Sequence, residues 1–180
     1  MTTATGGKTA TPATGSGGAS AAQAPSSANA GSGVPRELES LTVNITQEIH
    51  VRASVATTFE ALLQEMGPGN RGQHEVSMPM TLEAWPGGRW FRDLGDGNGH
   101  LWGHVQAIKR PTLIEIAGPL MMSFAVASNV QYRLKESEGG TLITLRHTAL
   151  GLFPPDGYRE ALGQGWTLIF DRLRRRFDNA

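Results

Sequence analysis

The chain has 180 residues, a formal net charge of zero and no cysteine. Its length predicts one domain with additional segments, and the absence of cysteine excludes disulfides and thiolate metal sites. The balanced charge gives no electrostatic footprint for nucleic acid, and no apolar stretch is long enough to span a bilayer, so we expect a soluble, cytoplasmic protein. One basic cluster, interpreted as cations that favour the dipole of a helix end, consists of Arg172, Arg174, Arg175 and Arg176.

The N-terminal segment, residues 1–36, consists almost entirely of Ala, Gly, Ser, Thr and Pro. Such a segment has too little apolar surface to offset the entropy lost on ordering, so we expect a disordered tail. It lacks the basic start and apolar run of a secretory signal, and it lacks the several arginines of a transit peptide. Residues 37–180 are then expected to form one domain around a single core.

The domain is predicted to begin with a strand and a helix. Residues 41–51 alternate between apolar and polar side chains, which is the period of a half-buried strand. Ser54 can accept a hydrogen bond from an unpaired backbone N–H and so begin a helix. The apolar stripe of that helix consists of Val55, Phe59, Leu62, Leu63 and Met66. The Gly-Pro-Gly sequence at 67–69 is expected to end it.

Six short strands are predicted next, separated by turn residues. Their ranges are 77–85, 89–93, 100–109, 112–116, 126–136 and 141–149. Pro-Gly-Gly at 86–88 and Gly-Asp-Gly-Asn-Gly at 95–99 mark the first two turns. Pro111 interrupts the chain, and residues 137–140 indicate a hairpin between the last two strands.

The final segment carries the longest periodic pattern. Its apolar residues recur at helical spacing and consist of Tyr158, Leu162, Trp166, Ile169, Phe170, Leu173 and Phe177. A helix with so wide an apolar stripe must lie against a sheet, which predicts an α+β domain. Gly163 and Gly165 each cost such a helix about 1 kcal/mol relative to Ala. Either close backbone packing or the mouth of a cavity beside a movable helix end explains them.

Three stretches in this order resemble the START-like helix-grip (SRPBCC, Bet v-type) superfamily. They are Gly-Gly-Arg-Trp at 87–90, the strand and proline break at 103–111, and the Gly-Trp helix from Pro155 to Phe177. Within the superfamily, the sequence most closely resembles activators of the heat shock protein 90 ATPase. The resemblance implies a curved antiparallel sheet of about six to seven strands wrapped around a long C-terminal helix.

In such a fold, core residues near the mouth also line a ligand pocket. The candidate ligand-binding residues are Trp90, Arg92, Tyr132, His147, Trp166 and Phe170. Two interpretations of His147 stay open, a hydrogen-bonded core residue and a ligand contact or proton donor. Arg92 is either a surface residue or an inward guanidinium that needs Glu83, Glu115 or an anionic ligand as its partner.

His100 and His104 are too far apart on a strand, roughly 13 Å, to share one metal ion, so we expect no metal site. If Leu101, Gly103 and Val105 face the helix, as the resemblance implies, then His100, Trp102 and His104 face outward. We expect this outward face to be a surface for a protein partner. The inverted assignment would place Trp102 inside.

No phosphate loop, dinucleotide fingerprint or convincing catalytic set is present in the sequence, and we expect no cofactor and no catalytic residues. The leading hypothesis is a non-enzymatic domain that holds a small hydrophobic molecule between sheet and helix. A co-chaperone-like interaction module, implied by the resemblance, is the first alternative. An enzyme of the polyketide cyclase or aromatase kind, using His147, is the second.

Overall fold

The computed structural model of the chain describes residues 36–154 and 157–178. The predicted tail lies outside the described residues except for Arg36, which begins a short helix that the sequence did not predict. In chain order the elements are α1 (Arg36–Ser40), β1 (Thr42–Val51), α2 (Val55–Met66), the 3₁₀ turn η1 (Gln73–Glu75), β2 (Thr81–Leu82), β3 (Arg89–Gly95), β4 (Asn98–Lys109), β5 (Leu113–Gly118), β6 (Val126–Ser137), β7 (Gly140–Gly151) and α3 (Tyr158–Asp178).

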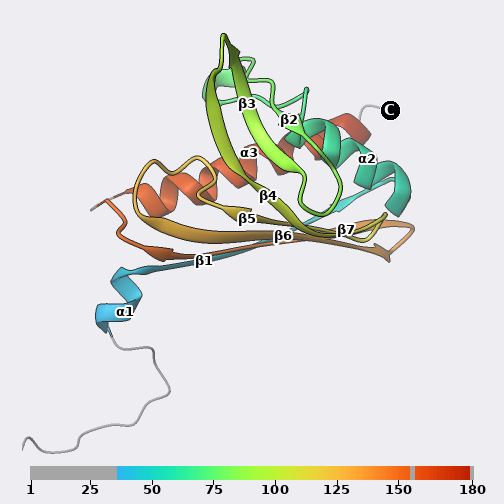
Figure 1. Ribbon diagram of the computed structural model, residues 1–180. Helices are drawn as coiled ribbons and strands as arrows, with labels where there is room; N and C mark the ends of the chain where they lie inside the picture. The colour runs from blue at the N-terminus through green and yellow to red at the C-terminus, as the bar shows by residue number, and fades with distance from the viewer. Residues whose placement is uncertain (1–35, 155–156, 179–180) are drawn as a thin grey trace, which may run out of the picture. The chain divides into compact units, whose positions relative to one another are not determined.

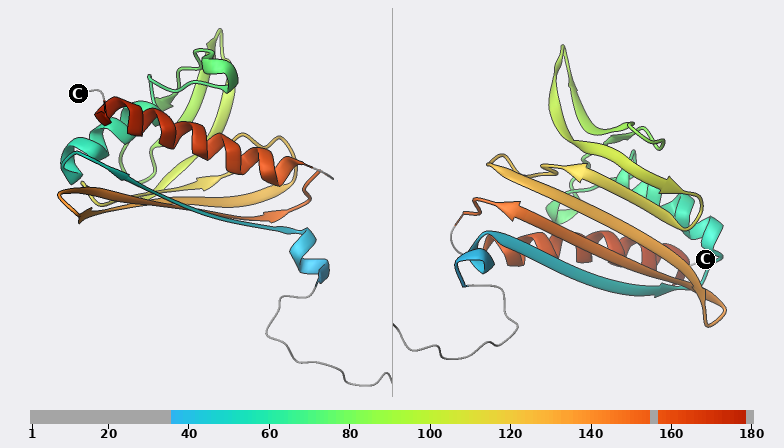
Figure 2. Two further views of the ribbon diagram at one scale, coloured as in Figure 1. Left: turned by 180° about the vertical axis from the view of Figure 1, so that it is seen from behind. Right: turned by 60° about the horizontal axis from the view of Figure 1, so that its bottom comes forward.

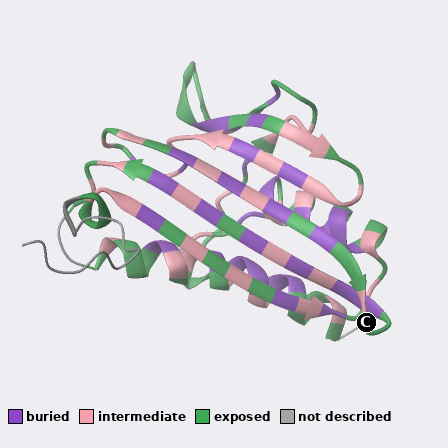
Figure 3. Cartoon of the chain, turned by 90° about the horizontal axis from the view of Figure 1, so that it is seen from below, coloured by how far each residue is buried: buried purple, intermediate pink, exposed green. Residues whose placement is uncertain are grey.

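The seven strands form one antiparallel sheet in the order β1-β7-β6-β5-β4-β3-β2. This confirms the predicted α+β helix-grip fold. Figures 1 and 2 show α3 lying across the concave face of the curved sheet with α2 beside it, while β3 and β4 extend beyond the sheet as a projecting hairpin. Along the strands, buried residues alternate with more exposed ones (Figure 3), as expected when only one face packs on a core.

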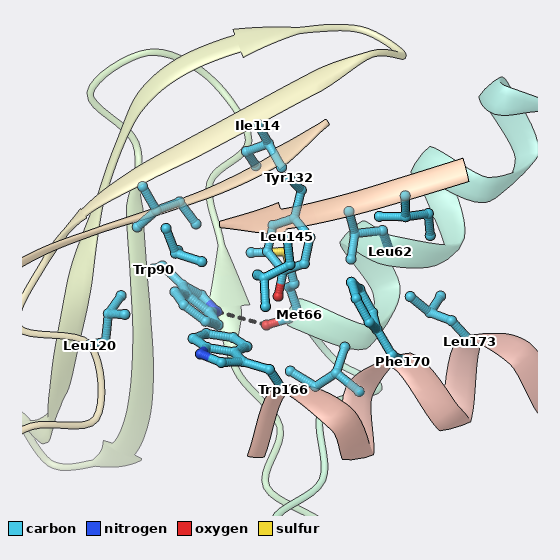
Figure 4. Packing of buried hydrophobic residues seen from close by; sticks show 14 of the residues in the cluster. Leu62, Met66, Trp90, Ile114, Leu120, Tyr132, Leu145, Trp166, Phe170 and Leu173 are labelled. Carbon is cyan, nitrogen blue, oxygen red and sulfur yellow. Dashed lines mark hydrogen bonds between the residues drawn. The ribbon is translucent and has the colours of Figure 1, made fainter. Parts of the chain in front are cut away.

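Both long helices match their predicted ranges. Ser54 begins α2 by accepting a hydrogen bond from the backbone N–H of Thr57 over 3.2 Å. Leu62 on this helix, and Trp166 and Leu173 on α3, are buried together against the sheet (Figure 4). Phe59 on α2 is fully buried as well. The hydrophobic free energy of burying these side chains favours the packing of α3 against the sheet. In the part of the chain that the structure describes, no helix is long and apolar enough to cross a membrane.

The strand predicted over 77–85 is reduced to the two residues of β2. Before β2, the chain pairs with the segment that follows α2: the N–H of Met78 donates to the oxygen of Asn70, and the N–H of Met80 donates to that of Gly67, both over 3.0 Å. Pro79, which lacks a backbone donor, separates these two bonds. The segment 70–80 therefore lies beside the end of α2 instead of extending the sheet.

The expectation that Trp102 faces outward is wrong. Trp90 pairs with Gly103 and Phe91 pairs with Leu101, so Trp102 is an extra residue in β4 with no cross-strand partner of its own. Such a bulge interrupts the alternation of inward and outward side chains at that point. As a result Trp102 is only 7% exposed, whereas Leu101, which was expected to face the helix, is 46% exposed.

Candidate functional site

A cavity of about 390 Å³ lies along one side of α3. Ligand pockets in proteins typically range over roughly 300–1,000 Å³, so this volume suits a small molecule. The α3 side of its wall includes Leu162, Gly165, Trp166 and Ile169. The remaining wall comes from residues 70–72 and Met78 after α2, from Trp102 on β4 and from Met121 after β5. The wall is therefore largely apolar and is assembled from segments far apart in sequence.

Gly165 keeps part of this space open. A Cβ atom at Gly165 would meet nothing within 4 Å outside its neighbours and its own helix backbone. Close backbone packing therefore does not explain this glycine, which lies at the wall of the cavity. Gly163 is equally uncrowded but is not part of the wall. Its carbonyl accepts a hydrogen bond from the Gln47 side chain over 2.9 Å, which ties α3 to β1.

His147 lies behind Trp166, on β7. The indole N–H of Trp166 donates to Nδ1 of His147 over 3.0 Å, and Nε2 of His147 lies 3.2 Å from Oγ of Ser128. An indole nitrogen can only donate, so Nδ1 is the acceptor and Nε2 carries the proton donated to Ser128. The imidazole is fully buried, and this burial lowers the pKa of His147 to about 4. Both ring nitrogens of the neutral imidazole are thus engaged within the protein.

Of the six predicted ligand-binding residues, Trp166 lines the cavity and the other five do not. Trp90, Tyr132 and Phe170 are buried in the core around it (Figure 4). The Tyr132 ring packs edge-on against Trp166 and Phe170, with centroids 6.2 and 6.3 Å apart. Burial raises the pKa of the Tyr132 phenol, whose hydroxyl has no hydrogen-bond partner among the described residues. These aromatic residues support the wall rather than form it.

Arg92 lies on the projecting hairpin, opposite His100 in the β3–β4 register. Neither expected carboxylate is its partner. Glu83 pairs with Arg89 over 2.6 Å, and this contact holds the pKa of the Glu83 carboxyl well below its usual range. Glu115 accepts hydrogen bonds from the side chains of two β6 residues, Asn129 and Gln131. Arg92 is therefore separate from the cavity.

The sequence comparisons identify the family. The family model described as "Activator of Hsp90 ATPase homolog 1-like protein" matches residues 74–178, more than half of the chain. The chain belongs to this family. No protein with a curated description matches the chain by sequence.

Solved structures share the fold of this Hsp90 ATPase activator homolog family member at low sequence identity. Ara h 8.0201 is 14% identical over 77% of this chain and 99% of its own, with a TM-score of 0.59. An uncharacterised protein from Rhizobium leguminosarum is 19% identical over 77% and 96%, with a TM-score of 0.58. The di-domain ARO/CYC StfQ of the steffimycin biosynthetic pathway is 17% identical over 78% of this chain and 52% of its own, with a TM-score of 0.54.

The cavity wall includes residues that the sequence analysis did not predict, because loops provide much of this wall. Asn70 shapes one loop: its side-chain amide donates to the oxygen of Met78 over 3.0 Å and is 3% exposed as a residue. No periodic pattern in the sequence pointed to Asn70, Met78 or Met121. An asparagine after a helix-ending Gly-Pro-Gly was the one available sign of an ordered turn there.

Arg172 was interpreted as one of four cations that favour the dipole of a helix end, but it is instead a buried residue that contacts α2. Its side chain is 8% exposed, and its Nε donates to Glu65 on α2 over 2.9 Å. Nη1 and Nη2 have no partner within residues 36–154 and 157–178. Arg172 follows Gly165 by seven residues, so both lie on the same face of α3. That spacing was the sequence signal for an inward arginine.

His100 and His104 are exposed, and the described residues contain no group of three or more side chains able to hold a metal ion. With Trp102 buried, the predicted partner surface has lost its aromatic residue. The hairpin exposes two leucines instead, Leu94 on β3 at 60% and Leu101 on β4 at 46%.

Proposed function

We propose that this domain binds a small apolar molecule in the cavity beside α3 and does not transform it. The cavity itself is the observation that carries the proposal. Its volume of about 390 Å³ and its apolar wall suit such a molecule. The helix contains a glycine at the wall, where a larger residue would stabilise the helix but fill the space.

The arrangement of His147 favours binding over catalysis. A general acid or base must reach the reacting group within hydrogen-bond distance. His147 is behind Trp166, outside the wall, and its two nitrogens are committed to Trp166 and Ser128. The cyclase-like alternative therefore loses the residue on which it depended.

The test measures binding of the neutral apolar dye N-phenyl-1-naphthylamine, whose fluorescence rises in an apolar site. Wild type should bind the dye, and Gly165→Leu should weaken its affinity about tenfold or more, since every 1.4 kcal/mol of lost contact is tenfold. Gly163→Leu is the matched control, because it places the same side chain two residues away, outside the wall. Equal dye affinity in the two variants, or no binding by wild type, would contradict the proposal.

A second candidate function is binding of a protein partner through the β3–β4 hairpin. Two observations favour it: the family is named for activation of the Hsp90 ATPase, and the hairpin exposes Leu94 and Leu101. The chain should then raise the ATPase rate of purified Hsp90, and replacing both leucines with serine should remove the stimulation. His74→Ser, at another exposed site, is the control. Unchanged ATPase rates with the wild-type chain would exclude this candidate.

A further inference from the structure

Asn70 places a buried amide in the wall of the cavity, with 3% of the residue exposed. Its backbone is fully bonded, because its N–H donates to the oxygen of Gly67 over 3.1 Å and its oxygen accepts from the N–H of Met78 over 3.0 Å. Its side-chain nitrogen donates to the oxygen of Met78 over 3.0 Å. Of the polar groups of Asn70, the side-chain oxygen Oδ1 is therefore the one without a partner among the described residues.

The bond to Met78 also fixes which way the amide of Asn70 is turned. A carbonyl oxygen can only accept, so the amide nitrogen faces Met78 and Oδ1 lies on the other side of the amide group. Oδ1 is not one of the side-chain atoms that are enclosed without a partner, so another molecule can reach it. Asn70 lines the cavity and is otherwise covered by protein, so its reachable part faces the cavity. Oδ1 is thus an unused acceptor at the wall.

The buried indoles of the wall do not offer an occupant a hydrogen bond. The indole N–H of Trp166 donates to His147, and the indole nitrogen of Trp102 is enclosed, without a partner in the described part of the chain. Tyr158 adds a phenol, and burial raises the pKa of Tyr158, so its hydroxyl stays protonated and can either donate or accept. Asn70 Oδ1 can only accept. An occupant that displaces water from it without supplying a donor loses a hydrogen bond.

The charge of the wall restricts that donor. Arg71 is the one formally charged side chain among the lining residues, and its Nη1 donates to the oxygen of Glu75 over 3.3 Å. An ammonium group would share the wall with this cation and would find no carboxylate there as a counter-charge. An ionised carboxylate offers only acceptors and cannot pair with Asn70 Oδ1. A neutral hydroxyl supplies the donor without either cost.

We propose that the cavity selects apolar ring compounds that carry a neutral hydroxyl, through a hydrogen bond from that hydroxyl to Asn70 Oδ1. This inference rests on the binding function proposed above and names the class of molecule that the same cavity takes. The indoles of Trp102 and Trp166 and the thioethers of Met78 and Met121 give the wall polarizable surfaces that favour flat rings. Asn70 is then the residue that determines specificity.

The test compares 2-naphthol with 2-methoxynaphthalene, two flat probes in which a hydroxyl donor is replaced by a methyl ether. Each probe displaces N-phenyl-1-naphthylamine from the full chain, and the ratio of their affinities is measured. Asn70→Leu removes the acceptor, so the ratio in favour of the naphthol should fall about fivefold, the equivalent of one net hydrogen bond. Gln164→Leu is the matched control, because it removes an exposed amide outside the wall, and it should leave the ratio unchanged.

Tyr158→Phe separates Asn70 from the other side chain of the wall that can bond a hydroxyl. The variant keeps the aromatic ring that packs edge-on against Phe124, with centroids 5.0 Å apart, and removes only the phenol oxygen. The affinity ratio should stay within about twofold of the wild-type ratio, since that is less than the effect of one net hydrogen bond. A fall in the ratio with Tyr158→Phe and none with Asn70→Leu would assign the hydroxyl to Tyr158 and overturn the inference.

A further measurement needs no variant, which matters because Asn70 also orders its loop. In spectra of the ¹³C- and ¹⁵N-labelled wild-type chain, the side-chain ¹³Cγ signal of Asn70 should move downfield with 2-naphthol and not with 2-methoxynaphthalene. Equal affinity ratios in wild type and Asn70→Leu, or equal movement of the signal with both probes, would overturn this inference. The proposed function would stand in that case if the dye still binds and Gly165→Leu still weakens its affinity. Failure of the dye and both probes to bind wild type would overturn both proposals.

Discussion

The two long hairpins of the sheet, β6–β7 and β3–β4, differ in the regularity of their strand pairing. The β6–β7 pair keeps one register through twelve successive residue pairs, from Val126 opposite Gly151 to Ser137 opposite Gly140. The β3–β4 pair shifts register twice within a shorter ladder. The regular hairpin supplies the inner face on which His147 and Tyr132 support α3. The irregular hairpin turns Trp102 into the cavity wall. Regular pairing thus builds the support, and a local irregularity shapes the candidate site.

The largest expected effect concerns the regular side. Trp166→Ala should lower the free energy of unfolding by about 3–5 kcal/mol, because it removes a large buried side chain that α3 packs against the sheet. It also leaves Nδ1 of His147 without its donor. Denaturant unfolding of wild type and variant measures the difference. A variant with near-native stability would show that α3 does not depend on this support.

Trp102→Ser tests the irregular side. We expect a loss of about 3 kcal/mol, at the low end for truncating a large buried aromatic residue, since the change also removes an unsatisfied donor. His104→Ser, two residues along the same strand and exposed, should change stability by less than about 0.5 kcal/mol. If both variants lowered the free energy of unfolding by the same small amount, Trp102 would face outward like His104, and the bulge in β4 would be contradicted.

The dependence of the free energy of unfolding on pH tests whether His147 is buried in its neutral form. The pKa of this group is about 4 in the folded chain against 6.5 for the unperturbed side chain, so the unfolded state binds the proton first as the pH falls. The contribution of neutral His147 to the free energy of unfolding is complete above about pH 6.5 and is lost as the pH falls from 6.5 to about 4. Each pH unit in this window costs about 1.4 kcal/mol, which gives about 2 kcal/mol at pH 5.

His147→Asn is the comparison for that response, because it removes the titrating group and keeps a polar side chain. Unfolding free energies of wild type and variant should converge as the pH is lowered from 7 to 5. Parallel pH profiles would mean that His147 is not buried in its neutral form. Carboxyl groups that titrate below pH 5 affect both chains and cancel in the difference.

The smallest expected effect is a gain. Gly165→Ala should stabilise the chain by about 1 kcal/mol, since alanine favours the helix and its methyl group meets no neighbour. Dye affinity should change little, because a methyl group fills little of the cavity. Gly163→Ala should give the same gain. Thermal unfolding measures both variants. If Gly165→Ala were destabilised and Gly163→Ala were not, the added methyl group at Gly165 would be in a steric clash, and the space beside it would not be open.

Long repeating patterns were predictable from the sequence, and single interruptions were not. α2, α3, β6 and β7 were placed within a few residues, because an apolar period sustained over ten or more positions has one structural solution. The bulge at Trp102 changes the exposure of two residues of β4: Trp102 is buried and Leu101 is exposed, while Val105 stays buried and His104 exposed as expected. A pattern of alternation cannot report such a shift without knowledge of the neighbouring strand.

The candidate site shows the same limit. Trp166 was predictable because it belongs to the stripe of α3. Met78, Met121 and Asn70 reach the wall through loops whose paths depend on tertiary hydrogen bonds, such as that between Met78 and Asn70. The expectation of an outer surface at 100–104 was correct for both histidines' exposure and wrong for the tryptophan between them.

The wall of the cavity formed by residues 70–80 should open more easily than the walls formed by the sheet and α3, because of how this segment is hydrogen-bonded. The backbone N–H groups of Met78 and Met80 are bonded to Asn70 and Gly67, within the same stretch of chain, and not to the sheet. This stretch can therefore open as a local unit, at a free energy below that of global unfolding. Amide hydrogen exchange at Met78 and Met80 should be faster than at Val130 or Leu145 in the β6–β7 ladder. Exchange at these two methionines then reports how often this part of the cavity wall opens.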